Sequence, residues 1–233
     1  MALPFFYKED INATNVVLDE ATSKHIVQVL RMKSGEQLQL TNGKGNLFTA
    51  KITDDNRKKC GVTILSTDHQ PPATNISIAI SLIKNNNRFE WFLEKATEIG
   101  VTAIIPLVCE RTEKSAFKFE RLNGILISAM LQSQQSWLPV LQEPQKFSTF
   151  ISQAKQQQKF IAHCLDENSK KQLASQPINQ LTNKLILIGP EGDFTKDEIA
   201  YAVKHHFIPV SLGNTRLRTE TAGIVAATLL CVQ

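Results

Sequence analysis

Two glycine-containing corners carry the residues whose types and spacing could do chemistry. The first corner, IGPEGDF, spans Ile188–Phe194 at the end of the apolar run Leu185–Ile188, and the second corner, SLGNTRLRTETAG, spans Ser211–Gly223. A glycine at the end of a strand lets backbone N–H and C=O groups approach a flat ligand without a Cβ in the way. The two corners could therefore line one binding pocket, although ordinary turn chemistry would also explain either corner alone.

The second corner also gathers charged and hydroxyl side chains. They fall within six positions, at Arg216, Arg218, Thr219, Glu220 and Thr221. The apolar run Ile224–Leu230 follows, so these groups stand at the mouth of a buried helix that Thr219 or Thr221 can cap. A purely structural interpretation is also open, in which Glu220 favours the helix N-terminus and Arg218 pairs with a nearby carboxylate.

An alternation of strands and helices must position both corners. Leu185–Ile188 is typical of a short buried strand, and Thr195 and Glu198 have the spacing of a capping box, which predicts a helix from Thr195. Further strands are expected at Ile76–Ile83, Ala103–Val108, Phe160–Cys164 and Ile208–Leu212, and further helices at Phe89–Ile99, Lys118–Trp137 and Ala222–Leu230. This order predicts an α/β domain with a mainly parallel sheet, a fold that binds ligands at the carboxyl ends of its strands.

The N-terminal region has a different pattern, which predicts a small β module. Strands are expected at Gln37–Thr41, Asn46–Thr53 and Gly61–Ser66, after a helix at Glu20–Met32 that has Arg31 near its end. The stretch DHQPPATN, with its proline pair, is the best candidate for a linker. We therefore expect two domains, 1–70 and 71–233.

Composition excludes several classes of protein. The 233 residues are 42% hydrophobic, and no stretch has the uncharged apolar length of a membrane span or the pattern of a signal peptide, so a cytoplasmic protein is expected. Neither the dinucleotide-binding glycine motif nor the P-loop motif is present. The four cysteines and five histidines show no metal-binding spacing, and the formal net charge of +4 makes an anionic partner plausible without requiring one.

Four segments of the chain together resemble one known family. IGPEGDF and LGNTRLRTETA, with KNNNRFEWFLEKATEIGVTAIIPLVCERT upstream and HIVQVLR near the N-terminus, closely resemble the ribosomal RNA small subunit methyltransferase E family of the SPOUT superfamily. The resemblance covers nearly the whole chain. It implies an N-terminal PUA-like β-barrel at 1–70 and a C-terminal SPOUT α/β domain with a trefoil knot at 71–233.

The resemblance also implies an activity and its partners. A member of this family methylates N3 of one uridine in 16S rRNA of the small ribosomal subunit, acts as a homodimer, takes the methyl group from S-adenosylmethionine and needs no metal. Two alternatives stay open, because fold does not fix the substrate. One is a SPOUT enzyme that modifies another RNA base or a ribose hydroxyl, and the other is a non-enzymatic RNA-binding ribosome assembly factor.

Site residues follow from the same resemblance. Arg218 and Glu220 are the implied catalytic residues, with Glu220 helping to remove the uracil imide proton and Arg218 stabilising the developing anion or fixing the RNA backbone. The implied cofactor-binding residues are Ile188, Gly189, Pro190, Glu191, Gly192, Ser211, Leu212, Gly213, Leu217, Thr219, Thr221 and Ala222. The expected RNA contacts are Arg31, Lys84, Arg88 and Arg111.

The chain departs from the family pattern at several positions. Asp193 stands where many members have a second glycine, and Thr215 and Arg216 stand where they have arginine and isoleucine, so one arginine is displaced by one residue. Leu131 and Gln135 stand where glutamate and arginine are expected. RNA or dimer contacts at the last two positions are therefore either weakened or supplied by other side chains.

Overall fold

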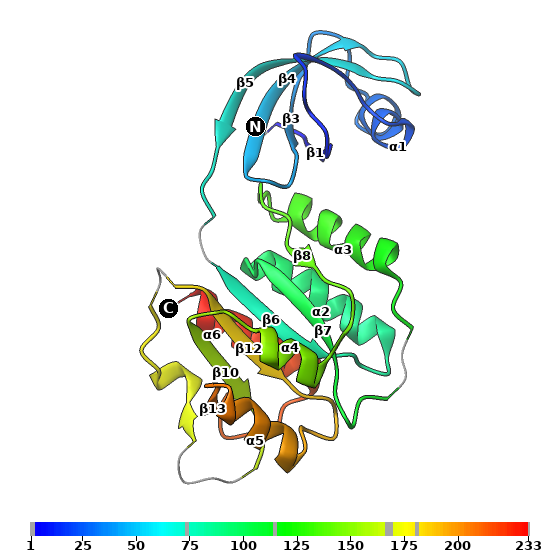
Figure 1. The fold of residues 1–233 in the computed structure, drawn as a ribbon. Coiled ribbons are helices and arrows are strands. Elements are labelled where there is room, and N and C mark those ends of the chain that lie inside the picture. The colour runs from blue at the N-terminus through cyan, green and yellow to red at the C-terminus, as the bar shows by residue number, and fades with distance from the viewer. Residues whose placement is uncertain (1–2, 73–74, 114–115, 166–169, 180–181, 233) are drawn as a thin grey trace. The chain divides into compact units, whose positions relative to one another are not determined.

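The structure is a computed structural model that describes residues 3–72, 75–113, 116–165, 170–179 and 182–232. The chain divides into two compact units (Figure 1). Unit 1 consists of Met1–Pro72 together with Met130–Leu138, and unit 2 consists of Ala73–Ala129 and Pro139–Gln233. The division at Pro72 lies close to the expected boundary, but the return of Met130–Leu138 to unit 1 had no counterpart in the sequence interpretation.

Unit 1 is built on a curled five-stranded sheet in the order β1-β3-β4-β5-β2. Its strands are β1 (Phe5–Tyr7), β2 (Asn15–Val17), β3 (Gln37–Thr41), β4 (Asn46–Asp54) and β5 (Gly61–His69). The pairs β3/β4, β4/β5 and β2/β5 are antiparallel, whereas β1 pairs with β3 in parallel. Alternate residues such as Leu38, Leu40 and Ile52 face a common core, and the three strands expected here are confirmed.

The helix expected at Glu20–Met32 is shorter than predicted. Asp19 caps α1 (Glu20–Lys24), which continues as the π-helical turn η1 (His25–Val29). The wider turn buries Ile26 completely and leaves Val29 69% exposed. Arg31 then adopts a left-handed conformation with a φ of 58°, because the chain must turn to bury Met32. Arg31 therefore lies beyond the helix rather than within its last turn.

Glycines in the β3–β4 hairpin explain why the later segment belongs to unit 1. At Gly45, which has a φ of 82°, an added Cβ would lie 2.5 Å from the Trp137 ring. The Trp137 indole N–H donates to the Gln70 carbonyl at 2.8 Å, and the Leu138 N–H donates to the Gly43 carbonyl at 2.9 Å. Trp137 thus packs flat against backbone that only glycine leaves accessible.

Unit 2 contains a parallel sheet in the order β11-β13-β10-β12-β6-β7-β8, with β9 also pairing with β7. Its strands are β6 (Ile76–Ser81), β7 (Ala103–Val108), β8 (Val140–Leu141), β9 (Gln145–Lys146), β10 (Gln158–Ala162), β11 (Lys171–Gln172), β12 (Lys184–Ile188) and β13 (Ile208–Ser211). All the recorded strand pairs are parallel, which confirms the predicted sheet. Every residue of β6 and β12 is buried, as expected for strands covered on both faces.

Helices cover both faces of this sheet. They are α2 (Asn86–Ile99), α4 (Phe147–Gln153), α5 (Lys196–Lys204) and α6 (Thr219–Cys231), and the chain also forms α3 (Phe119–Gln132) and the short 3-10 turn η2 (Leu173–Ser175). Ala79 belongs to the core beneath α4 and α5, whereas Ile80 packs beneath α6. At Gly223 of α6 an added Cβ would lie 2.5 Å from the Phe92 ring of α2, so this glycine permits the close packing of the two helices.

Helix ends follow local signals in most places. Gly100 ends α2 with a φ of 102°, and the predicted capping box of Thr195 and Glu198 starts α5. Two predictions were wrong. α3 ends at Gln132 instead of Trp137, because Gln134 turns the chain with a φ of 55°, and α6 starts after Arg218 with no side-chain cap from a threonine. In the described residues, no helix is long and apolar enough to cross a membrane.

Candidate functional site

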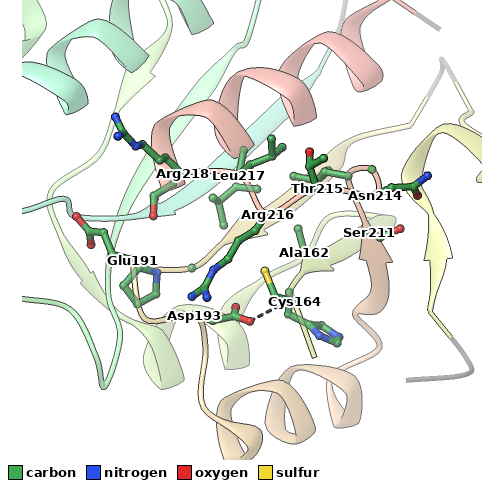
Figure 2. A pocket seen from close by; sticks show the side chains of 18 of the residues that line it. Ala162, Cys164, Glu191, Asp193, Ser211, Asn214, Thr215, Arg216, Leu217 and Arg218 are labelled. Carbon is green, nitrogen blue, oxygen red and sulfur yellow. Dashed lines mark hydrogen bonds between the residues drawn. The ribbon is translucent and has the colours of Figure 1, made fainter. Parts of the chain in front are cut away.

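A cavity of about 900 Å³ lies at the carboxyl ends of three neighbouring strands of unit 2. These strands are β13, β10 and β12, and the residues that follow them line the cavity (Figure 2). The two glycine corners therefore lie on either side of the end of β10. The cofactor residues predicted from the resemblance that line this cavity are Ile188, Gly189, Pro190, Glu191, Ser211, Leu212, Gly213, Leu217, Thr219 and Ala222. Gly192 and Thr221 do not line it.

The first corner is tightly fixed by its own residues. The Asp193 N–H donates to the Pro190 carbonyl at 2.9 Å, and Asp193 has a left-handed φ of 63°. One carboxylate oxygen of Asp193 accepts the N–H of Phe194 at 2.8 Å. Phe194 is buried against Phe147, and a Cβ added at Gly189 would lie 3.1 Å from the Phe194 ring. The corner therefore has little room to move.

The loop after β7 also holds the first corner. Glu198, which is buried, accepts the N–H of Thr195 at 2.9 Å with one oxygen and the N–H of Glu110 at 2.9 Å with the other. The Arg111 guanidinium donates to the Gly192 carbonyl at 2.7 Å. Arg111 was predicted to contact RNA, and the structure gives it this additional role as a support for the corner.

Residues after β10 form a third wall, which the sequence interpretation missed. Ala162, His163 and Cys164 line the cavity, and so does Lys170. The expected strand ending at Cys164 could have indicated this wall, because the carboxyl ends of parallel strands meet at one edge of a sheet. The order of the strands could not be predicted, however, so nothing indicated that β10 lies between β12 and β13.

The second corner is open in comparison. Asn214, Thr215 and Arg216 are exposed and line the cavity, although they were not predicted to bind the cofactor. Figure 2 shows the Arg216 side chain extending across the cavity toward Asp193. Arg218 also lines the cavity, and among the residues described no carboxylate forms an ion pair with either guanidinium.

Glu220 is buried and does not line the cavity. Its side chain is 8% exposed, and its Oε1 lies 3.6 Å from the Arg88 Nε. Its Oε2 is buried and has no hydrogen-bond partner in the described parts of the chain. The structure therefore pairs a predicted catalytic carboxylate with a predicted RNA-binding arginine, at the adjoining N-terminal ends of α2 and α6.

The other predicted RNA contacts are exposed. The Lys84 side chain is 72% exposed and pairs with Glu113 at 2.8 Å, and hydrogen bonding to Glu113 raises the pKa of Lys84. Arg31 is exposed in unit 1. No group of three histidine, cysteine, aspartate or glutamate side chains suited to a metal ion is found within the described ranges.

Comparison with known proteins identifies the family. The family described as RNA methyltransferase domain matches residues 69–231, and the one described as RNA methyltransferase PUA domain matches residues 18–65. The chain is 31% identical to ribosomal RNA small subunit methyltransferase E of Buchnera aphidicola subsp. Acyrthosiphon pisum, over 98% of this chain and 92% of that protein.

Solved structures agree with this match. The crystal structure of a probable rRNA-methyltransferase from Porphyromonas gingivalis aligns with a TM-score of 0.90 and 39% identity, over 99% of both chains. That of a ribosomal RNA small subunit methyltransferase E from Neisseria gonorrhoeae, bound to S-adenosyl methionine, aligns with a TM-score of 0.85 and 28% identity, over 97% of this chain and 95% of that one. The chain therefore belongs to the ribosomal RNA small subunit methyltransferase E family of RNA methyltransferases.

Proposed function

We propose that this protein transfers the methyl group of S-adenosylmethionine to N3 of one uridine in the 16S rRNA of the small ribosomal subunit. The observation that carries this proposal is the cavity in which both glycine corners of the family pattern meet at the carboxyl ends of β12 and β13. Its volume of about 900 Å³ falls within the range of about 300–1,000 Å³ typical of small-molecule sites.

The lining of the cavity fits S-adenosylmethionine. Ile188, Leu212 and Leu217 provide apolar surface for a flat base, and the backbone of both corners provides donors and acceptors for its edges. Glu191 adds negative charge to a cavity that would receive a cationic sulfonium group. When bound, the cofactor supplies an activated methyl group, so the protein mainly has to position the acceptor and handle one proton.

Arg218 is the proposed stabiliser of negative charge on the acceptor. For N3 to bond to a methyl group, the N3 proton must leave, and negative charge develops on the uracil ring as it does so. Arg218 lines the cavity as the N-cap residue of α6, and it forms no ion pair with a carboxylate in the structure as described. Its guanidinium is therefore available to the uracil oxygens or to a neighbouring phosphate.

Glu220 is the proposed proton acceptor. It directly follows Thr219, which lines the cavity, and its buried Oε2 accepts no hydrogen bond from a described residue. An ionised carboxylate with an unused oxygen can receive a proton. The Arg88 guanidinium beside the other oxygen provides a charged partner for the ionised form.

The rest of the proposal concerns assembly and RNA binding. Residues 1–70 would act as the PUA-like RNA-binding barrel, and Arg31, Lys84, Arg88 and Arg111 would contact phosphates. The corners and α6 would form a trefoil knot. The chain passes from β13 at one side of the sheet back to α6 beneath β6, which is compatible with a knot. We further propose that the enzyme is a cytoplasmic homodimer.

Methyl transfer from labelled S-adenosylmethionine tests the proposal. The acceptors are small ribosomal subunits that lack the modification and, separately, free 16S rRNA, with mass identification of the nucleoside after digestion. We expect N3-methyluridine, and the comparison of the two acceptors shows whether the enzyme requires the folded particle. Another methylated nucleoside would contradict the proposed position. Cofactor binding without label on either acceptor would indicate a different RNA, and no cofactor binding would favour a non-enzymatic RNA-binding protein.

A further inference from the structure

Two side chains of opposite charge hold the wall of the cavity that follows β10. The Asp193 Oδ2 accepts the backbone N–H of Cys164 at 2.8 Å, which is the dashed contact in Figure 2. From the other end, the Lys170 Nζ donates to the His163 carbonyl at 2.9 Å and to the Leu165 carbonyl at 2.7 Å. One short backbone segment, 163–165, is therefore fixed by three hydrogen bonds to two charged groups.

Backbone geometry does not explain the aspartate. Asp193 has a φ of 63°, a conformation that glycine adopts more easily than a residue with a side chain. Both carboxylate oxygens are engaged, because Oδ1 accepts the Phe194 N–H while Oδ2 accepts the Cys164 N–H. An acidic side chain at a position that favours glycine indicates that its hydrogen bonds have a use.

The ordered side chain of Lys170 also has a cost in conformational entropy. Holding its long side chain against two carbonyl groups removes rotamer freedom that an exposed lysine would keep. Hydrogen bonds from a charged donor are stronger than those between neutral groups, so the contacts offset that cost. Both Lys170 and Asp193 line the cavity themselves.

We propose that Asp193 and Lys170 act together as positioning residues that clamp segment 163–165 as the third wall of the cofactor cavity, and thereby set the affinity for S-adenosylmethionine. This inference rests on the proposed function, which places the cofactor in that cavity. The clamp fixes the wall before the cofactor arrives, so less ordering remains to oppose binding. Neither side chain needs to touch the cofactor for this effect.

Titration calorimetry with S-adenosylmethionine tests the clamp. Asp193→Gly keeps the left-handed backbone and removes the side-chain contacts, and we expect about tenfold weaker binding, which equals about 1.4 kcal/mol. Asp193→Asn also tolerates this conformation, but its one acceptor oxygen cannot replace two, so its loss should be smaller. Lys170→Met should also weaken binding. Because both residues hold one segment, the double variant should lose less than the product of the two single losses.

Matched controls and a measurement without cofactor make the test decisive. Lys171→Met and Asp197→Asn alter exposed neighbours that do not line the cavity, and both should bind like the wild type. Without cofactor, N-ethylmaleimide should modify the exposed Cys164 several-fold faster in the Asp193→Gly and Lys170→Met variants. The clamp would be overturned if Cys164 in the Asp193→Gly and Lys170→Met variants reacted at the wild-type rate. It would also be overturned if these variants bound the cofactor with an affinity within twofold of the wild type. If the wild type itself binds no S-adenosylmethionine, the proposed function fails, and Cys164 modification still decides the clamp.

Discussion

The two glycine corners line the same cavity but are held in different ways. In the first corner, Asp193 and Phe194 are fixed by backbone and side-chain hydrogen bonds, and Arg111 and Glu198 connect it to the loop after β7. In the second corner, residues 213–216 are held more loosely. Among the described residues, their side-chain hydrogen bond is a long one of 3.4 Å, from the Gln172 amide to the Asn214 side-chain oxygen. One side of the site is therefore organised before a ligand binds, and the other is left for the ligand to order.

The two corners also contribute side chains of opposite charge to the cavity. The first corner contributes Glu191 and Asp193 to the cavity, whereas the second contributes Arg216 and Arg218. An acidic side suits a cationic sulfonium group, and a basic side suits an anionic RNA and a developing uracil anion. This comparison predicts that changes in the first corner mainly affect cofactor affinity, and changes in the second mainly affect transfer to RNA.

The largest effect is expected at the second corner. Arg218→Ala should reduce the rate of methyl transfer by about 100-fold or more, which is typical for the loss of one donor to a developing negative charge. The affinity for S-adenosylmethionine should change by less than about threefold, because the cofactor is proposed to bind through apolar surface and backbone groups. Single-turnover transfer to RNA and calorimetry with the cofactor measure the two quantities.

Arg216→Ala is the matched comparison for Arg218. Both arginines are exposed, but Arg216 lies farther from the N-terminus of α6, so we expect a smaller loss of transfer rate. A larger loss for Arg216→Ala than for Arg218→Ala would reassign the role, and would show that the displacement of one arginine from the family pattern moved the functional group.

Glu220→Gln tests the buried carboxylate of the second corner. A positioned proton acceptor typically contributes about 10²–10⁴-fold to a rate, so we expect transfer to fall by about 100-fold with cofactor affinity unchanged. Glu90→Gln is the control, because it removes the carboxylate that pairs with Arg121, another ion pair of α2. Normal turnover by the Glu220→Gln variant would exclude Glu220 as the proton acceptor.

The sequence predicted the framework of unit 2 better than its site. The strands around β12 were found because continuous apolar runs bounded by glycine, proline and polar residues are typical of strands buried on both faces, and the start of α5 because a capping box is a local signal. Lys170 was missed because its place at the cavity depends on the order of the strands, which no local pattern encodes. The burial of Glu220 against Arg88 depends in the same way on how α6 packs against α2.

Unit 1 shows the same limit on a smaller scale. Helical spacing predicted one helix through Met32, yet the chain needs a π-turn and a left-handed Arg31 to bury both Ile26 and Met32. Likewise, Trp137 was predicted within a helix, but its ring packs against Gly45, far away in the sequence. Tertiary packing overrode local preference in both places.

A more moderate effect is expected when a side chain is added to a glycine of the first corner. Gly189→Ala would place a Cβ 3.1 Å from the buried Phe194 ring, which is held by Phe147 and cannot retreat easily. We expect a loss of about 1–3 kcal/mol in the free energy of unfolding, and weaker cofactor binding. Gly124→Ala in α3 is the control, because its added Cβ meets no atom within 4 Å and alanine favours a helix. Equal stability of the two variants in denaturant titrations would contradict a fixed first corner.

The smallest effect concerns the reactivity of two cysteine thiols, one that lines the cavity and one that is buried. Cys164 lines the cavity and is exposed, whereas Cys109 lies at the end of β7 and burial raises its pKa to about 12. At pH 8 the Cys109 thiol therefore stays protonated, and since the thiolate is the nucleophile, it should not react in the folded protein. N-ethylmaleimide should modify Cys164 first, and S-adenosylmethionine should slow that reaction about in proportion to the fraction of protein bound. Mass spectrometry of digested protein identifies the modified cysteine.

Protection of Cys164 would support a cofactor position beside the wall after β10. Equal modification rates with and without saturating cofactor would mean that the cofactor leaves this wall open, and that the two glycine corners alone enclose it.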